Sequence, residues 1–407
     1  MSLDTFPWSS ATNYASGPDV GTPTKTDPGY NQITNLVPVG AQAVNYLFNE
    51  RDQFLQQIPI GWQPVVDPGS SNVATLMASG YDPQTGLWFR GSLYASGGSQ
   101  PHIEWCYGDG QWFADNTVWP TTGSEGVPTK ILSFCPSPGA GTSGPWLVLA
   151  TDGSYVGAYT FNINNATPSA TSATIPHAGN VGAITTIGTT IIIASGGVGW
   201  QLYNASISTT LLTRATTVNK LMVVSSPAFT ITAADADNTY AVTVPSLATT
   251  TYTFPSAMGI GSGNLIAGLA YHTAIDGAYW VVAVTGASGA TFWTSIDGVA
   301  WTQKGALPAS GSFGSRQISE LVSSGLALVA VAGPLAVPPA GDQTAILTRV
   351  YTSTNGGASW QYAPVSLNSY TGSALLISAR AAGGQVYVQS GRVSVMSDAY
   401  SAGSTIV

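Results

Sequence analysis

Short apolar runs separated by turn-forming residues dominate residues 61–407, and they constrain the fold more than any other feature of the sequence. Typical runs cover residues 146–150, 190–193 and 279–282, with Gly, Pro, Ser, Thr and Asn between them. Runs of this kind are typical of β-strands. Long helices usually need many charged residues for their solvated face, but only 7% of this chain is Asp, Glu, Lys or Arg. The sequence therefore predicts an all-β fold over 61–407.

These runs group into successive units of about 50 residues, the usual length of a four-stranded propeller blade. The expected units are 73–119, 130–175, 181–214, 220–254, 264–303, 317–363 and a seventh from 373. The seventh unit supplies only three good strands. Residues 61–66 resemble the outer strands at 199–202 and 359–362, since all three segments carry a Trp-Gln pair. We therefore expect 61–66 to complete the last blade, which closes the ring and removes its exposed edges.

A tight hairpin is expected at the end of the fifth unit. Asp297-Gly298 is a strong turn signal, because Gly adopts positive φ without steric cost. The Ser295 hydroxyl and the Asp297 carboxylate are short enough to hydrogen-bond the amides of the turn. We expect Trp301 to start the outgoing strand and to lay its indole over the hairpin.

A second hairpin repeats this pattern at Ser353, Asn355, Gly357 and Trp360, with Asn in place of Asp and a turn that is one residue longer. Both hairpins resemble the Asp-box, the Ser-x-Asp-x-Gly-x-x-Trp repeat of sialidase-like β-propellers. In that family the box is structural. The resemblance thus implies a β-propeller of about seven four-stranded blades, and it implies no catalytic role for these residues.

The first 60 residues differ from the repeat region in composition and in the spacing of their apolar residues. Residues 1–37 are rich in Pro, Gly, Ser and Thr without an apolar period, which predicts an extended arm. Residues 41–58 predict a short helix, which ends at Pro59. The apolar stripe of this helix fits packing against its own domain, and it also fits association with a second copy. Two heptads are too few to decide between the two.

The runs 21–25 and 38–49 resemble the N-terminal regions of bacteriophage tail-fibre and other virion appendage proteins. The resemblance implies that residues 1–60 dock the protein on other virion proteins, and that the protein is a homo-oligomer located in the virion. The propeller would then face outward and attach to a host-surface glycan or receptor. No signal peptide is expected, because Asp4 comes early and a basic first region is missing. Residues 326–337, the most apolar window, are too short to span a bilayer.

Aromatic residues crowd into the first unit and are candidates for glycan binding, since flat aromatic faces stack on sugar rings. The candidates are Trp88, Trp105, Tyr107, Trp112 and Trp119. The alternative is that they pack between strands and blades, because alternation along a strand buries half of such positions.

A sialidase-like hydrolase is the enzyme alternative, and it needs clustered arginines for the substrate carboxylate and an acidic pair. The arginines of the repeat region are Arg90, Arg214, Arg316, Arg349, Arg380 and Arg392, and its glutamates are Glu104, Glu125 and Glu320. The Arg-Ile-Pro run of that family does not occur. We therefore assign no catalytic residue. A ligand-free decoration protein of the capsid or tail is the third alternative.

Charge and metal-binding residues exclude other classes of function. The net charge is −8 and no basic cluster occurs, so nucleic-acid binding is not expected. His102, His177 and His272 are isolated, and no metal or cofactor is expected. Asp235 and Asp237 could hold Ca²⁺, but a solvated turn is preferred. Cys106 and Cys135 are expected to be buried thiols, with a disulfide between blades as the alternative.

Overall fold

The computed structural model describes the repeat region in segments: 62–64, 73–82, 87–94, 100–106, 113–114, 119, 126–136, 146–161, 169–205, 209–274, 277–287, 289–307, 318–325, 327–332, 347–368, 377–382, 385–390 and 393–397. The expected arm over 1–37 and the expected helix over 41–58 lie outside these residues. Regular structure in the described part is β-strand, apart from one 3₁₀ turn, η4 (Ser256–Met258). No helix there is long and apolar enough to cross a membrane.

The strands of the first half form three antiparallel sheets, and within each sheet the strands pair in chain order. The first sheet contains β2 (Val73–Asp82), β3 (Leu87–Tyr94), β4 (His102–Cys106) and β5 (Phe113–Ala114). The second contains β6 (Lys130–Pro136), β7 (Trp146–Thr151), β8 (Tyr155–Phe161) and β9 (Ser169–Ala178). The third contains β10 (Val181–Ile187), β11 (Thr190–Gly197), β12 (Gly199–Asn204) and β13 (Thr209–Arg214).

Three further sheets follow the same order, each with its first strand innermost. The fourth contains β14 (Leu221–Ser225), β15 (Thr230–Ala234), β16 (Thr239–Thr243) and β17 (Thr249–Thr253). The fifth contains β18 (Leu265–Ala274), β19 (Gly277–Gly286), β20 (Gly289–Ser295) and β21 (Thr302–Ala306). The sixth contains β22 (Ile318–Ser323), β23 (Leu328–Ala332), β24 (Leu347–Ser353) and β25 (Gln361–Asn368).

The seventh sheet joins the two ends of the repeat region. It contains β26 (Ile377–Ala382), β27 (Gln385–Ser390), β28 (Val393–Ser397) and, as its outermost strand, β1 (Trp62–Pro64). β1 pairs antiparallel with β28, and Trp62 lies opposite Ser397. The described residues 62–64 therefore occupy the place that the sequence predicts for the segment 61–66. The division of the chain into an arm and a propeller at residue 60 stays a prediction.

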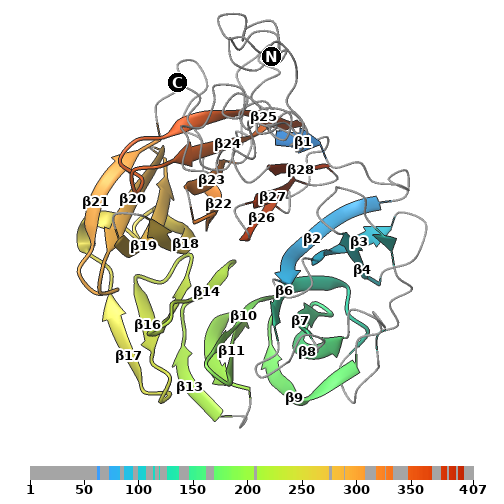
Figure 1. The fold of residues 1–407 in the computed structure, drawn as a ribbon. Coiled ribbons are helices and arrows are strands. Elements are labelled where there is room, and N and C mark those ends of the chain that lie inside the picture. Colours follow the sequence, from blue (N-terminus) through green and yellow to red (C-terminus); the bar gives the residue numbers. More distant parts are fainter. Residues whose placement is uncertain are drawn as a thin grey trace, which may run out of the picture. The chain divides into compact units, whose positions relative to one another are not determined.

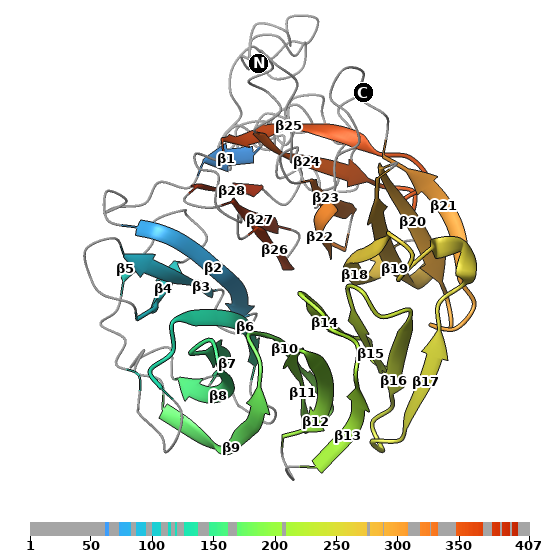
Figure 2. The same ribbon diagram turned by 180° about the vertical axis from the view of Figure 1, so that it is seen from behind.

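The sheets stand around a common axis (Figures 1 and 2). Their innermost strands contact one another in sequence order from β2 through β6, β10, β14, β18 and β22 to β26, and β26 in turn contacts β2. This cycle of contacts closes the ring. The all-β propeller that the sequence predicts is confirmed.

Burial changes from the second strand to the outer strand of a sheet. Every residue of β7, β15 and β23 is buried, because adjacent sheets cover both faces of these strands. A strand that is covered on both faces needs apolar residues at successive positions. This is why the sequence shows continuous apolar runs here and not an alternation of apolar and polar residues. The outer strands β17 and β21 are mostly exposed and rich in Thr, Gln and Lys.

The apolar core is divided among the interfaces between neighbouring sheets. Between the first and second sheets, the Phe89 and Trp146 rings meet edge to face, with centroids 4.2 Å apart. Between the fifth and sixth, Phe292 packs against Trp360 with centroids 4.1 Å apart. Each sheet is therefore stabilised by its neighbours rather than by a single central core.

Candidate functional site

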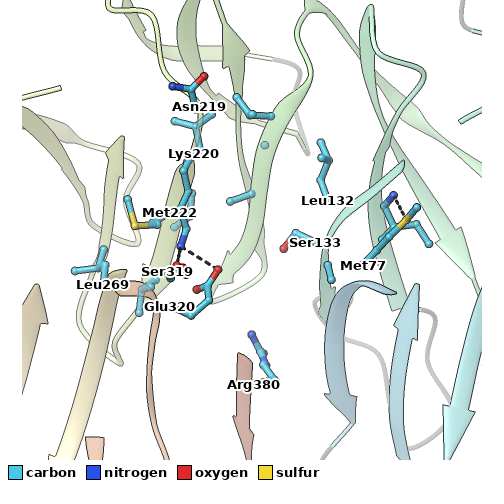
Figure 3. Close-up of a pocket in the computed structure, with 18 of the residues that line it drawn as sticks. Met77, Leu132, Ser133, Asn219, Lys220, Met222, Leu269, Ser319, Glu320 and Arg380 are labelled. Carbon is cyan, nitrogen blue, oxygen red and sulfur yellow. Dashed lines mark hydrogen bonds and ion pairs between the residues drawn. The ribbon is translucent and has the colours of Figure 1, made fainter. Parts of the chain in front are cut away.

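The innermost strands surround a cavity of about 490 Å³ on the axis of the ring, which we call the central channel (Figure 3). Its wall combines aliphatic and polar surface, with Met77 on β2 and Leu269 on β18 among the apolar lining side chains. The charged residues that line it among those described are Lys130, Lys220, Glu320 and Arg380. Three cations and one carboxylate thus meet in a chain whose net charge is −8.

Lys220, just before β14, ties three sheets together at this channel. Its ammonium group donates to the carbonyl oxygens of Ala267 (2.8 Å) and Ser319 (2.5 Å). It also lies 2.9 Å from Oε1 of Glu320 on β22. Burial raises the pKa of Glu320, and the charge and hydrogen bond of Lys220 partly offset that effect. All three N–H donors of Lys220 are therefore matched by oxygen atoms.

Arg380 on β26 enters the channel from the seventh sheet (Figure 3). Arg380 is exposed within the channel, and partial desolvation of its guanidinium lowers its pKa; burial lowers the pKa of the half-buried Lys130 on β6 in the same way. The nearby thiol of Cys135 supplies no counter-charge, since burial raises its pKa to about 12. Cys106 is also a buried thiol, so the disulfide alternative is wrong.

A second cavity lies on the outside of the ring and is bounded by the two predicted hairpins. This lateral cleft encloses about 520 Å³ and is lined by Tyr279 on β19, Asp297, Lys304 on β21 and Asn355. Ile296, at its edge, is 85% exposed. One aromatic ring, one carboxylate, one ammonium and one amide therefore converge on a single outer surface.

The first hairpin is organised by the Asp297 carboxylate. Its Oδ1 accepts hydrogen bonds from the Ser295 hydroxyl (2.9 Å) and from the amides of Val299 and Ala300 (both 2.8 Å). The two amides lower the pKa of Asp297, and the hydroxyl adds to the effect. Gly298 has φ of +73°, as the turn requires.

Trp301 differs in part from the expectation. The outgoing strand begins at Thr302, and Trp301 lies just before it. Its ring packs against Tyr240 and Phe254 of the neighbouring sheet, with centroids 6.1 and 5.7 Å away. Its Nε1 donates to the Tyr240 hydroxyl (3.0 Å), which donates to the carbonyl oxygen of Gly298 (2.8 Å). The indole therefore joins two sheets, because that interface buries it more completely than its own hairpin would.

The second hairpin uses the Asn355 side chain in the same way. Asn355 Oδ1 accepts from the Ser353 hydroxyl (3.0 Å) and from the Ser359 amide (2.9 Å). The Gly357 amide donates to the Ser353 hydroxyl (2.9 Å), and Trp360 Nε1 donates to the Gly357 carbonyl oxygen (3.2 Å). Both hairpins thus have the structural role expected of an Asp-box, while membership of that family stays a prediction.

The predicted glycan-stacking aromatics are not gathered on a surface. Trp88 is 1% exposed and packs against Tyr387 of the seventh sheet, and Trp119 is 4% exposed and packs against Tyr159 of the second. The prediction is wrong for Trp88 and Trp119, because their rings fill interfaces between sheets. Trp105 is half-buried on β4. Two candidates lie outside the described residues, Tyr107 and Trp112.

Asp235 and Asp237 are buried, so the expectation of a solvated turn is wrong. Asp235 Oδ1 accepts from the Asn219 amide (3.0 Å). Asp237 accepts from Arg214 Nε (3.1 Å) and from Trp200 Nε1 (3.2 Å), which links the third sheet to the fourth. The described part of the chain holds no group of three or more His, Cys, Asp or Glu side chains placed to bind a metal.

The arginines considered for a hydrolase are dispersed. Among the described residues, Arg380 is the one arginine in the central channel. Arg90 is buried, with its Nε 2.7 Å from Glu104 Oε2 and its Nη1 3.0 Å from the Tyr387 hydroxyl. Arg349 lies on β24, the third strand of its sheet. Three of the residues considered lie outside the described part, namely Arg316, Arg392 and Glu125.

The comparisons with known proteins support the ring of sheets. No family model and no curated protein matches the sequence. Solved structures match over 83% of this chain, with TM-scores near 0.5. The fold is a β-propeller. Virginiamycin B lyase from Staphylococcus aureus, an inactive variant with quinupristin, has 11% identity and a TM-score of 0.52 over 99% of its chain.

Two further propellers match equally well. YCF48 from Cyanidioschyzon merolae has 12% identity and a TM-score of 0.51 over 98% of its chain. A chain of the Mitotic Checkpoint Complex has 10% identity and a TM-score of 0.50 over 94% of its length. At such identities the similarity shows the fold alone, and function has to be argued from the sites of this chain.

Sequence reasoning missed both cavities. Lys130 and Lys220 were not singled out, and Glu320 and Arg380 were considered only as parts of a hydrolase. Lys130 begins β6 and Lys220 directly precedes β14, so each stands at the start of an innermost strand. In a chain with only eleven Lys and Arg residues, cations at equivalent places in the repeat are a usable signal.

Proposed function

We propose that this protein is a bacteriophage virion appendage or tail-fibre protein that docks through residues 1–60 and presents its propeller to the host surface. The virion placement rests on the sequence likeness of 21–25 and 38–49. The attachment role rests on one structural observation, the lateral cleft. A glycan of the host surface is the ligand proposed for it.

The chemistry of the lateral cleft suits a sugar. The half-buried Tyr279 ring lines the cleft, and Asn355 keeps one N–H donor beyond its bonds to Ser353 and Ser359 in the hairpin. Asp297 accepts and Lys304 donates, so hydroxyl groups of either orientation find partners. Concave sites with a few convergent polar groups are typical of small-ligand binding. The cleft takes over the role first predicted for Trp88 and Trp119.

Binding to a panel of bacterial surface polysaccharides tests the attachment role. The intact protein is expected to bind at least one polysaccharide and to compete with phage adsorption. Lys304→Ala removes an exposed charge of the cleft and is expected to weaken that binding, whereas Arg380→Gln in the central channel leaves it unchanged. Protein that binds no polysaccharide and does not compete with adsorption supports the ligand-free decoration protein instead.

The hydrolase alternative has one observation in its favour. Glu320 lies in a cavity with a raised pKa, as a general acid does. Glycoside hydrolysis usually needs a second carboxylate, and Glu320 is the one carboxylate that lines the central channel among the described residues. A screen with fluorogenic glycosides discriminates between the two functions, and turnover that is lost in Glu320→Gln establishes the enzyme.

A further inference from the structure

We propose that the central channel is a binding site for a small oxyanion, a carboxylate or phosphate group, which Arg380 holds. This site is separate from the lateral cleft, and the inference does not depend on the proposed virion function. It rests on the charges in the channel and on which of them already have partners.

The positive charge of the channel is not balanced by the protein. Lys220 is neutralised by Glu320 and its donors are used by two carbonyl oxygens and that carboxylate. Arg380 and Lys130, the two other cations of the channel, have no paired carboxylate among its described lining residues. A bound anion would supply the counter-charge that the lining lacks.

Arg380 has the geometry for an oxyanion. A guanidinium presents parallel N–H donors that match the two oxygens of a carboxylate or phosphate group. Its neighbour Cys135 does not compete for this role, because a thiol whose pKa is about 12 stays neutral. The pKa of Arg380 and that of Lys130 are both lowered by burial, and a bound anion would raise both.

The size and lining of the channel limit the ligand to a small acid. A volume of about 490 Å³ accommodates a phosphate ion or an acidic monosaccharide. Met77, Met222 and Leu269 supply apolar contacts, while Ser133 and Asn219 supply further polar atoms. A sugar acid could therefore place its carboxylate on Arg380 and its ring against the aliphatic wall.

Affinity for the anion is expected to rise as pH falls. Glu320 has a raised pKa, and its protonation removes the one negative charge from the channel. The charged groups that face it are Lys220 before β14, Arg380 on β26 and Lys130 on β6. His272 of β18 contacts Ser323 farther along the same strand as Glu320. A proton on Glu320 or Lys130 adds positive charge to the channel, so both titrations act in the same direction.

Isothermal titration of the full chain in a zwitterionic buffer tests the site with three probes: inorganic phosphate, glucuronate and neutral glucose. Saturable binding of phosphate, glucuronate or both, without binding of glucose, is expected. Binding of phosphate alone indicates a phosphate ligand, and stronger binding of glucuronate indicates a sugar acid. Glucuronate affinity should increase from pH 8 to pH 5, where its own carboxylate stays ionised.

Three variants separate the site from general electrostatics. Arg380→Gln should weaken anion binding at least about tenfold, the loss of one charge-assisted hydrogen bond, and Arg380→Lys should weaken it less. Lys25→Gln changes the net charge equally and lies in residues 1–60, and it should bind anions as the parent does. Glu320→Gln should bind glucuronate more tightly at pH 8 and lose most of the pH dependence.

Two results would overturn the proposal. One is the lack of saturable binding of either anion to the folded parent protein. The other is equal affinity in the parent and Arg380→Gln. Circular dichroism shows whether Arg380→Gln is folded. If it is not, Glu320→Gln tests the proposal, because a glucuronate affinity at pH 8 equal to that of the parent would also contradict the site. Polysaccharide binding by the lateral cleft is measured separately, so either function can fail alone.

Discussion

The Tyr240 hydroxyl joins the fourth sheet to the hairpin of the fifth, and its removal in Tyr240→Phe should destabilise the protein. The hydroxyl donates to the Gly298 carbonyl oxygen (2.8 Å) and accepts from Trp301 Nε1 (3.0 Å). Tyr240 is fully buried, and Gly298 and Trp301 are buried as well. Burial raises the pKa of Tyr240, so the hydroxyl keeps its proton. Phenylalanine therefore leaves two buried polar groups without a partner.

Each unsatisfied buried group costs about 1–2 kcal/mol, so Tyr240→Phe should lower the free energy of unfolding by about 2–4 kcal/mol. Equilibrium urea unfolding, followed by tryptophan fluorescence, measures the change. Tyr252→Phe is the matched control: Tyr252 stacks on Tyr240 with centroids 5.8 Å apart, and its hydroxyl makes no hydrogen bond to a described residue. The control should stay within about 0.5 kcal/mol of the parent. Equal stabilities of the two variants would refute the reasoning.

Three more perturbations test other parts of the fold. Gly298→Ala should lower the free energy of unfolding by about 1–3 kcal/mol, because φ is +73° and the new Cβ would lie 2.8 Å from a Phe229 ring carbon. Gly153→Ala is the control: its φ is +99° but no atom lies near the new Cβ, so it should lower the free energy of unfolding by less. The pKa of Asp237 is lower than the usual aspartate value. Burial alone would raise it, but the hydrogen bonds from Arg214 and Thr239 together have the larger, opposite effect. Asp237→Asn should thus have a free energy of unfolding about 1–3 kcal/mol lower than the parent at pH 7, as measured by urea unfolding. The difference between the two proteins should decrease as pH falls below about 4, where the parent carboxylate becomes protonated. Deletion of 61–66 should lower the melting temperature and promote aggregation through the bared edge of β28, and an unchanged melting temperature contradicts the closure.

The arrangement of strands could be predicted because its signals are local. Apolar runs and turn residues mark each strand, and the Trp-Gln pair at Trp62 marks the outer strand that completes the seventh sheet. The turns at Asp297 and Asn355 were predictable for the same reason, since the side chain and the amides it binds are only a few residues apart.

The sites could not be predicted because they combine residues that are distant in the sequence. Alternation along a strand does not reveal which face meets a neighbouring sheet, so the sequence left both glycan binding and packing between blades open for Trp88 and Trp119. A carboxylate such as Asp237 looks solvated until Arg214 of another sheet is placed beside it. Likewise, Lys130 and Arg380 line one channel only because the ring brings the second and the seventh sheets to a common axis.

The pairing of β1 with β28 also has a consequence for how the chain folds. The first six sheets consist of consecutive strands, so each can form from local contacts as soon as its own segment is available. The seventh sheet is complete only when β1, from the start of the repeat region, pairs with β28 at its end. Of the described strand pairings, this one closes the longest loop and therefore has the largest entropic cost. We expect an open, six-sheet intermediate to precede the native state in refolding, and this late step should set the rate.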